Sequence, residues 1–462
     1  MNVKKLVCSI ISLSLLVNCG IAALPVSASA VDTDTEIYVS PDGNDSNSGS
    51  SESPFKTLER AKAEVRVHNS NMSGNIIVNI ASGVYYMDNT LEFTQADSGT
   101  NGFSVIYRGI TDENGNSPIV SGGVDISDNW ELYDESLNIY KHENIDWSFR
   151  QLYTNNDRAI RARVPNLENK ETGGPYFRAS GGDGSYPLFI GTNNEYAQKA
   201  GNDAEIIWNS SWSQFRARIE SYNSSTGRVT FKAPDNSFAW NHHTQGDTPF
   251  YLENSLAYLD SEGEWYLDKD TSTLYYKPRE GEIMNKTEII APKLETIIDI
   301  NGTDENKTEN ITFDGIQFLH SNWLAPDSYG YCSAPKSMVQ LRHTKNISLI
   351  NSEFSFSGSW GIMGYEDTEN TVIDHNVFTK NAGGGVTMGM AGREWDDQTE
   401  NEQPRTYTDM DGQSRYDTIT NNYIDHVACE YQDMVGIGAM LPQHMTIANN
   451  EIGYLPYTGI NI

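Results

Sequence analysis

Five segments in the last third of the chain align without gaps, and this repeat limits the possible folds most strongly. They are ITFDGIQF (311–318), ISLINSEF (347–354), TVIDHNVF (371–378), DTITNNYI (417–424) and MTIANNEI (445–452). Their third and eighth positions are apolar and the positions between are mostly polar, which is the two-residue period of a half-buried strand. Three segments carry asparagine at the sixth position: Asn376, Asn422 and Asn450. The repeat predicts stacked strands with an apolar column and an asparagine ladder.

The spacing of the segments indicates the class of repeat. Their starts are 36, 24, 46 and 28 residues apart, and the shortest interval suits one coil of a right-handed parallel β-helix. The longer intervals are coils with inserted loops. Each coil buries its apolar column only by stacking on its neighbours. A leucine-rich repeat is the alternative, but its LxxLxL signature is absent.

Each coil is predicted to hold a second strand, marked by Ile362, Val386, Ile437 and Ile460. Three of these residues lie eight positions after the repeat segment, whereas Ile437 lies thirteen positions after it. The five extra residues, CEYQD (429–433), are therefore a loop inserted just before that strand. A glycine precedes each of the four aliphatic residues: Gly361, Gly385, Gly436 and Gly459. Such a column indicates a tight bend with positive φ or a surface that something approaches closely. We favour the bend, and the two interpretations are compatible.

Three carboxylate-rich loops flank this glycine column, and we interpret the column as the floor of a groove. They are CEYQD, the segment 392–416 and YEDTEN (365–370). Solvated surface loops are the simpler explanation, but loops on a rigid scaffold are also where binding and catalytic sites are built. The predicted substrate-binding residues are Trp360, Trp395 and Tyr457, as rings that contact sugars, and Gly436 in the groove floor.

The N-terminal part divides into a cap, first coils and an insertion. Residues 31–123 hold a polar loop, a short amphipathic helix with Leu58, Ala61 and Val65 on one face, and the first coils. The helix would cover the open end of the β-helix. Residues 124–290 alternate short strands with turns, which predicts an intercalated β-sandwich. Residues 291–462 are the later coils. The basic cluster Arg158, Arg161 and Arg163 is predicted to pack a domain interface, with a substrate carboxylate site as the alternative.

The N-terminus and the charge indicate an exported protein. Residues 1–30 show a basic start, an apolar stretch and small residues near Ala30, the pattern of a cleaved signal peptide. The remaining chain has 30 basic and 63 acidic residues, a formal charge of −33. This charge argues against nucleic acid or an anionic membrane as partners. Cys332 and Cys429 allow one disulfide, and neither lies in a CxxC spacing, so no metal and no cofactor is predicted.

Four stretches of the chain are characteristic enough for a comparison with known families: YVSPDGNDSNSGSSESPFKTLERA, FRQLYTNNDRAIRARVPN, GEWYLDKDTSTLYYKP and NEIGYLPYTGI. They resemble right-handed β-helix glycoside hydrolases, in particular glycoside hydrolase families 120 and 141. The resemblance implies a β-helix with an intercalated β-sandwich and acidic catalysts on the helix coils. Those families include β-xylosidase, xylanase and fucosidase activities, so a xylan-like or fucosylated polysaccharide is the implied substrate. The loop that carries Asp433 is the best match to the catalytic position.

Glycoside hydrolysis uses two carboxyl groups that flank the scissile bond. We predict Asp433 as one member of the pair and Glu430 or Glu394 as the other, with Asp396 in the same loop as Glu394. The alternative for Asp433 is that it only caps the turn. A polysaccharide lyase is the first alternative function, but the aligned repeats carry no basic residue near the glycine floor. A non-catalytic carbohydrate-binding or adhesive β-helix is the second.

The sequence ends at YTGINI, within the second strand of the fifth coil. An uncapped coil leaves unpaired backbone groups and an exposed apolar column. The expectation is therefore that the native protein continues with more coils and a further C-terminal module.

Overall fold

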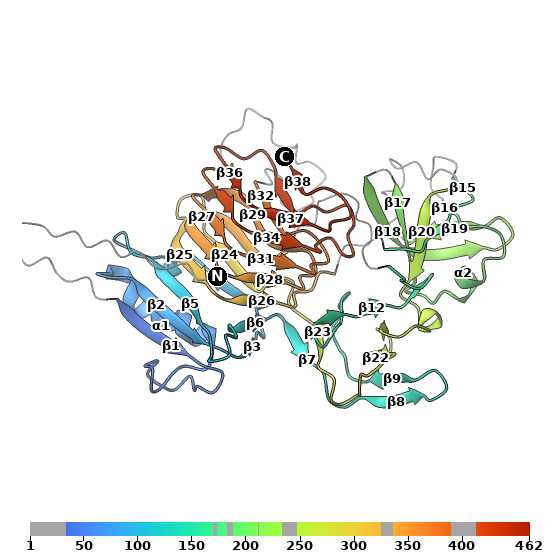
Figure 1. The fold of residues 1–462 in the computed structure, drawn as a ribbon, viewed down its shortest axis with the longest axis horizontal. Coiled ribbons are helices and arrows are strands. Elements are labelled where there is room, and N and C mark those ends of the chain that lie inside the picture. The colour runs from blue at the N-terminus through green and yellow to red at the C-terminus, as the bar shows by residue number, and fades with distance from the viewer. Residues whose placement is uncertain are drawn as a thin grey trace, which may run out of the picture.

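The computed structural model describes residues 34–169, 173–182, 188–210, 212–232, 247–324, 336–389 and 413–462. Within them the chain forms the predicted right-handed parallel β-helix, into which a large β-structured insertion is placed (Figure 1). No helix among the described residues is long and apolar enough to cross a membrane.

The β-helix consists of two parallel sheets whose strands come from successive coils. The larger has 14 strands, and its main path is β1 (Thr35–Val39), β2 (Ile76–Ala81), β5 (Val105–Ile110), β25 (Thr308–Asp314), β27 (Ser337–Ile350), β29 (Trp360–Glu369), β32 (Val386–Met388), β35 (Ile437–Ala439) and β38 (Ile460–Asn461). Beside this path pair β4 (Leu91–Phe93), β24 (Ile298–Asn301), β30 (Val372–Asp374), β33 (Thr418–Thr420) and β36 (Thr446–Ala448). The second sheet has seven strands in the order β3 (Val84–Tyr86), β6 (Ile119–Ser121), β26 (Gln317–Leu319), β28 (Glu353–Ser355), β31 (Val377–Thr379), β34 (Tyr423–Asp425) and β37 (Glu451–Gly453).

The register of these strands confirms the aligned repeat. The eighth column pairs Phe318 with Phe354, Phe354 with Phe378, Phe378 with Ile424, and Ile424 with Ile452. The third column pairs from Phe313 to Leu349, Ile373, Ile419 and Ile447 in the same way. The predicted second strand is also confirmed, because Ile362, Val386, Ile437 and Ile460 are successive partners. The five-residue insertion therefore shifts the sequence spacing without shifting the stack.

The asparagine ladder is confirmed as well. The side-chain oxygen of Asn422 accepts from the backbone N–H and the side-chain amide of Asn376, at 2.9 and 3.1 Å. Asn450 receives the equivalent two bonds from Asn422, at 3.0 and 2.9 Å. The amide nitrogen of Asn422 also donates to the carbonyl of Ile373. Each asparagine thus satisfies backbone groups at a turn that the neighbouring strands leave unpaired.

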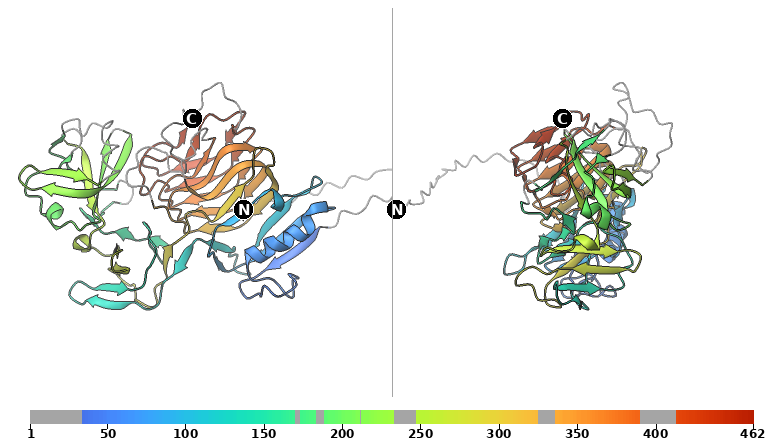
Figure 2. Two further views of the ribbon diagram at one scale, coloured as in Figure 1. Left: turned by 180° about the vertical axis from the view of Figure 1, so that it is seen from behind. Right: turned by 90° about the vertical axis from the view of Figure 1, so that its right-hand side faces the viewer.

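The helix α1 (Leu58–His68) begins after Thr57, whose hydroxyl accepts from the backbone N–H of Arg60. It buries the predicted face, Leu58, Ala61 and Val65, against the core of the first coils. Figure 2 shows the helix lying along the first strands at the N-terminal end of the stack. This packing keeps the apolar interior of the first coil away from water.

The insertion runs from β7 (Gly123–Asp125) to β23 (Ile289–Pro292), which pair with each other in antiparallel fashion. Two separate apolar cores hold it, one around Trp130 and Trp265 and the other around Trp208 and Phe250. Two lobes are visible beside the β-helix in Figure 1. The sequence predicted an intercalated β-sandwich here, and within this β-structured insertion the structure has two packed units.

Among the described residues, three sheets, of four, five and eight strands, build these lobes. The first core is covered by β10 (Tyr153–Thr154), β11 (Asp157–Arg158), β12 (Ile160–Arg161), β8 (Glu131–Asp134), β9 (Ile139–His142), β21 (Glu264–Asp268) and β22 (Thr273–Tyr276). The second is covered by β13 (Arg163–Val164), β14 (Phe177–Arg178), β15 (Gly181–Gly182), β16 (Leu188–Phe189), β17 (Glu205–Ser210), β18 (Ser213–Asn223), β19 (Arg228–Phe231), β20 (Pro249–Glu253) and the helix α2 (Glu195–Lys199).

Candidate active site at the junction of the β-helix and the insertion

The inserted CEYQD loop joins the fourth coil to the insertion. Its backbone is anchored on the preceding coil, because the N–H of Cys429 donates to the carbonyl of Asn381 and the N–H groups of Glu430 and Tyr431 donate to that of Ala382. Its side chains reach the other way, toward β11, β17 and β18. We call residues 429–433 the junction loop.

Glu430 forms an ion pair with the insertion. One of its oxygens accepts from the Arg158 guanidinium at 2.8 Å, and the other accepts from the Gln151 amide at 2.9 Å. Arg158 is buried and also donates to the carbonyl of Lys380 in the third coil. The predicted interface role is therefore confirmed for Arg158. Because both oxygens of Glu430 are held by the insertion, we assign this residue to the interface and no longer to the catalytic pair.

The next two residues extend the same contact. Tyr431 is 4% exposed, and the guanidinium of Arg216 lies 4.6 Å from the centre of its ring. The side-chain oxygen of Gln432 accepts from the Tyr176 hydroxyl at 3.2 Å and from the Asn209 amide at 3.1 Å. The junction loop therefore fixes the position of the insertion relative to the coils.

Asp433 is the buried carboxylate of the junction loop. Its residue is 6% exposed, and one oxygen accepts from the backbone N–H of Gln214 at 3.3 Å. In the sequence it stands between Gln432, which makes the polar contacts above, and Met434 and Val435, which belong to an apolar cluster. A buried carboxylate at a domain junction is placed where enzymes carry out acid–base chemistry. Its catalytic role stays a prediction.

A charge network in the insertion lies behind the junction loop. Arg150 and Arg161 donate to both Glu205 and Glu253, over distances from 2.7 to 3.2 Å. Arg216 approaches the same two glutamates at 3.7 and 3.8 Å. Burial alone raises the pKa of Glu205, but the arginines outweigh it and hold that pKa well below its ordinary value. These arginines are already paired with protein carboxylates, which favours a structural role over substrate binding.

The predicted stacking role of Trp360 is wrong. Its ring is 1% exposed and packs with Trp323, Ala382, Tyr431 and Met434. The indole fills the space between the β-helix and the junction loop, so no sugar ring can reach it. Tyr457 is 44% exposed and stays a candidate for sugar contact. Glu394, Trp395, Asp396 and Cys332 lie outside the described residues.

The groove floor predicted from the glycine column is also wrong. A Cβ atom at Gly436 would lie 2.7 Å from the carbonyl oxygen of Gly459 and 2.9 Å from Ile452. The same collision would occur at Gly361 and Gly385, each with the carbonyl of the glycine one coil further on. None of the four glycines has positive φ. The column exists because the coils approach each other too closely at this corner for any side chain, so Gly436 contributes no ligand surface.

The sequence interpretation missed a pair of carboxylates on the larger sheet. Glu92 in β4 and Asp299 in β24 are direct partners on adjacent parallel strands, on the face opposite the buried Leu91 and Ile298. Burial, with a smaller contribution from Glu92, raises the pKa of Asp299. Adjacent strands are about 4.8 Å apart, near the separation of about 5 Å in retaining glycosidases. The signal was the matching apolar–acidic–apolar pattern of LEF (91–93) and IDI (298–300).

Comparison with known proteins supports the predicted class. Residues 137–279 match the family model described as the GH141 insertion domain. A solved structure titled "Glycoside hydrolase" has a TM-score of 0.79 at 24% sequence identity, covering 92% of this chain and 79% of that chain. The resemblance to β-helix glycoside hydrolases of family 141 is thus confirmed for the insertion and for the architecture, and it supports a glycoside hydrolase.

Two further solved structures are more distant. "The complex structure of XylC with xylose" has a TM-score of 0.48 at 12% identity, covering 90% of this chain and 58% of that chain. The GH136 lacto-N-biosidase from Eubacterium ramulus has a TM-score of 0.33 at 11% identity, covering 90% and 55%. No curated protein matches the chain.

Proposed function

We propose that this chain is a secreted glycoside hydrolase that cleaves a complex polysaccharide, xylan-like or fucosylated, with a pair of carboxylates. The observation that carries the proposal is the GH141-type insertion, which is docked through a loop that holds the buried Asp433. The strongly acidic chain suits a neutral glycan more than a polyanionic one. Secretion rests on the signal-peptide pattern of residues 1–30.

In this proposal Asp433 is one of the two reacting carboxylates. Its burial limits its access to water, and one of its oxygens accepts a hydrogen bond from the backbone N–H of Gln214. The second carboxylate comes from the 392–416 loop, with Glu394 as the candidate. The alternative is a separate site in which Asp299 and Glu92 form the pair and Asp433 takes no part. Each alternative predicts a different inactive variant.

The test is release of reducing sugar from a broad panel of glycans by the full mature chain. We expect Asp433→Asn to lower kcat by at least about a hundredfold, with little change in thermal midpoint, because asparagine still accepts the Gln214 N–H. Glu430→Gln is the matched control in the same loop. It removes the ion pair to Arg158 and should lower stability more than activity.

The other outcomes distinguish the alternatives. If Asp299→Asn is inactive and Asp433→Asn is active, the catalytic pair is Asp299 and Glu92 on the larger sheet. Unsaturated uronide products would identify a polysaccharide lyase. Saturable glycan binding without any product would identify a non-catalytic carbohydrate-binding protein.

A further inference from the structure

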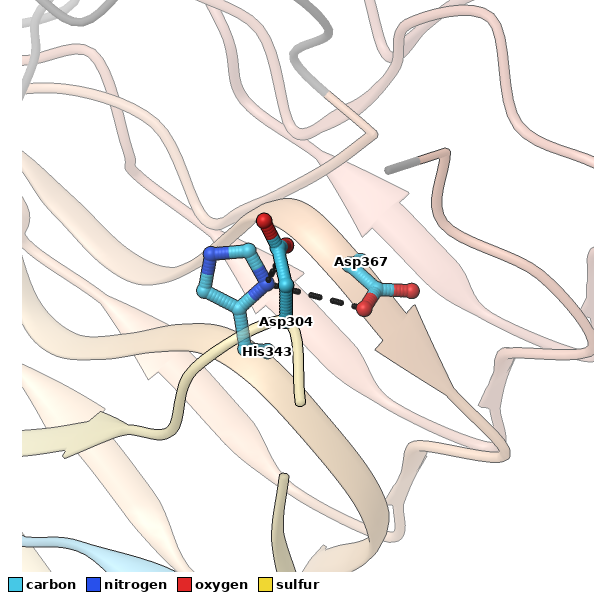
Figure 3. A group of neighbouring side chains, drawn as sticks. All are labelled: Asp304, His343 and Asp367. Atoms are coloured by element: carbon cyan, nitrogen blue, oxygen red, sulfur yellow. Dashed lines mark ion pairs between the residues drawn. The ribbon is translucent and has the colours of Figure 1, made fainter. Parts of the chain in front are cut away.

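A histidine and two aspartates from three separate segments meet where the turn before β25 approaches β27 and β29 of the larger sheet (Figure 3). Asp304 lies in the turn between β24 and β25, His343 lies in β27 and Asp367 lies in β29. The Nδ1 atom of His343 is 3.1 Å from an oxygen of Asp304 and 3.5 Å from an oxygen of Asp367. Both carboxylates therefore approach the same ring nitrogen.

The histidine nitrogen approaches both carboxylates without a hydrogen bond to either. His343 is 6% exposed, and its buried Nδ1 makes no hydrogen bond among the described residues; its contacts are the two ion-pair distances to Asp304 and Asp367. A buried polar nitrogen that lacks a well-oriented hydrogen bond is costly. A bound cation between the nitrogen and the two oxygens would remove that cost.

The distances fit coordination of a small divalent ion. Nitrogen and oxygen ligands lie about 2.0–2.2 Å from zinc in tetrahedral sites, so two ligands of one ion are about 3.4 Å apart. The two distances from Nδ1 are close to this value, and all three ligand atoms lie within 4.8 Å of one another. One imidazole and two carboxylates are a donor set that suits zinc and related transition metals.

The backbone holds the three ligands in place. His343 and Asp367 occupy matching positions on paired strands, and both have a left-handed φ of 48°. The turn that carries Asp304 is pinned to β27, because the N–H of Gly302 donates to the carbonyl of Arg342. A Cβ atom at Gly302 would lie 2.3 Å from the carbonyl oxygen of His343. The approach of Asp304 to His343 thus depends on a turn that accepts only glycine at this position.

Basic side chains of the described residues lie around the cluster, but their closest contacts are not with the carboxylate oxygen of Asp367 that would bind a metal ion. Lys307 is 2.8 Å and Arg415 is 3.7 Å from Oδ1 of Asp367, whereas Oδ2 is the oxygen that faces His343. On the far side of the ring, Glu366 lies 3.8 Å from Nε2. In histidine–metal sites a carboxylate commonly supports the second ring nitrogen. Lys307 would weaken the binding of a dication through charge repulsion without occupying its position.

We propose that Asp304, His343 and Asp367 bind a divalent transition metal ion of the zinc type. The ion fastens the turn 302–307 to β27 and β29 and leaves a coordination position to water, because Asp304 is mostly exposed. The site is separate from the proposed catalytic carboxylates and does not depend on them. It escaped the sequence analysis because its ligands are 39 and 24 residues apart.

Zinc titration of the chelator-treated full mature chain tests the proposal, with Zn²⁺ alone as the probe. Calorimetry should show one saturable site in the parent protein. Asp304→Ala should weaken Kd at least about tenfold, whereas Glu305→Ala, the matched acid of the same turn, should leave Kd within about twofold. Zinc should raise the thermal midpoint of the parent and of Glu305→Ala, and much less that of Asp304→Ala.

A further variant, Lys307→Gln, is expected to strengthen zinc binding, in contrast to Asp304→Ala. Lys307→Gln removes the cation next to Asp367 and should tighten zinc binding. The proposal is overturned if zinc does not bind saturably, or if all four proteins bind it with the same affinity. Those outcomes would assign the cluster to ion pairing of protonated His343 with the two carboxylates.

Discussion

The stacked coils and the junction with the insertion are stabilised by opposite chemistry. In the coils, Phe354 lies between Phe318 and Phe378 with ring centres 5.2 Å apart on both sides, and all three are nearly inaccessible to water. Behind the junction loop, three arginines share two buried glutamates. Every buried ring of the apolar column stabilises the folded state. The charge network stabilises it only when each buried charge keeps its partner. The comparison predicts that the two regions fail in different ways.

Truncation of the ring column should produce the largest effect. Phe354→Ala leaves a cavity between two aromatic neighbours and should lower the free energy of unfolding by about 3–5 kcal/mol. Urea denaturation of the mature chain measures this loss, and Phe354→Leu should lose less because it fills more of the space. A loss no greater than that of an exposed substitution such as Val377→Ala would contradict the stacked-column account.

Removal of one arginine should affect the insertion nearly as strongly. Arg161→Ala leaves Glu205 and Glu253 buried with fewer partners, and the expected cost is about 3–5 kcal/mol. Thermal unfolding followed by tryptophan fluorescence measures it, with the exposed Arg178→Ala as control. The double variant Arg161→Ala/Glu205→Gln should regain part of the lost stability. If it regains none, an uncompensated buried charge is not the cause of the loss in Arg161→Ala.

A third prediction concerns the pH dependence of the insertion. Burial raises the pKa of Glu264 to about 8 in the folded state, although three backbone N–H groups donate to its carboxylate. A carboxyl group with a raised folded pKa stabilises the fold below its unfolded pKa, and this contribution is lost as pH rises through about 8. Stability should therefore fall by a few kcal/mol between about pH 4.5 and pH 8, at about 1.4 kcal/mol per unit of pKa difference, and Glu264→Gln should flatten that fall. An identical pH profile in the variant would refute the assignment.

The smallest effect is expected at the asparagine ladder. Asn422→Ala removes the acceptor for Asn376 and the donor to the carbonyl of Ile373, and should cost about 1–3 kcal/mol. Hydrogen exchange at the N–H of Asn376 should accelerate in the variant. Thr446→Ala, at an exposed position of β36, is the control and should change stability by less than about 1 kcal/mol.

The fold was predictable because a parallel β-helix repeats its physical requirement at every coil. Each coil must present apolar side chains at the same positions, so the columns from Phe318 to Ile452 can be aligned by their spacing in the sequence. Even the offset of Ile437 was interpretable, since an insertion changes the count but not the stack. The glycine column was visible for the same reason, but its cause was not. Only the tertiary structure shows that Gly436 faces the carbonyl of the next coil.

The site was only partly predictable, because its residues are brought together by packing between distant segments. The junction loop was found as an irregularity in the repeat, yet the assignment of Glu430 depended on Arg158, which lies 272 residues away in the sequence. Trp360 was chosen as a ring near the groove, and its burial depends on the tertiary contact with Tyr431 and Trp323.

By itself, the sequence determined the parallel β-helix, the capping helix, the place of the insertion and the loop that joins them. These features follow from local periodicity and from repetition, which a single chain displays along its length. The tertiary structure decided which carboxylates are paired and which are enclosed, and it brought Asp304, His343 and Asp367 together. Burial and charge pairing depend on neighbours that are distant in the sequence, and no local pattern encodes them.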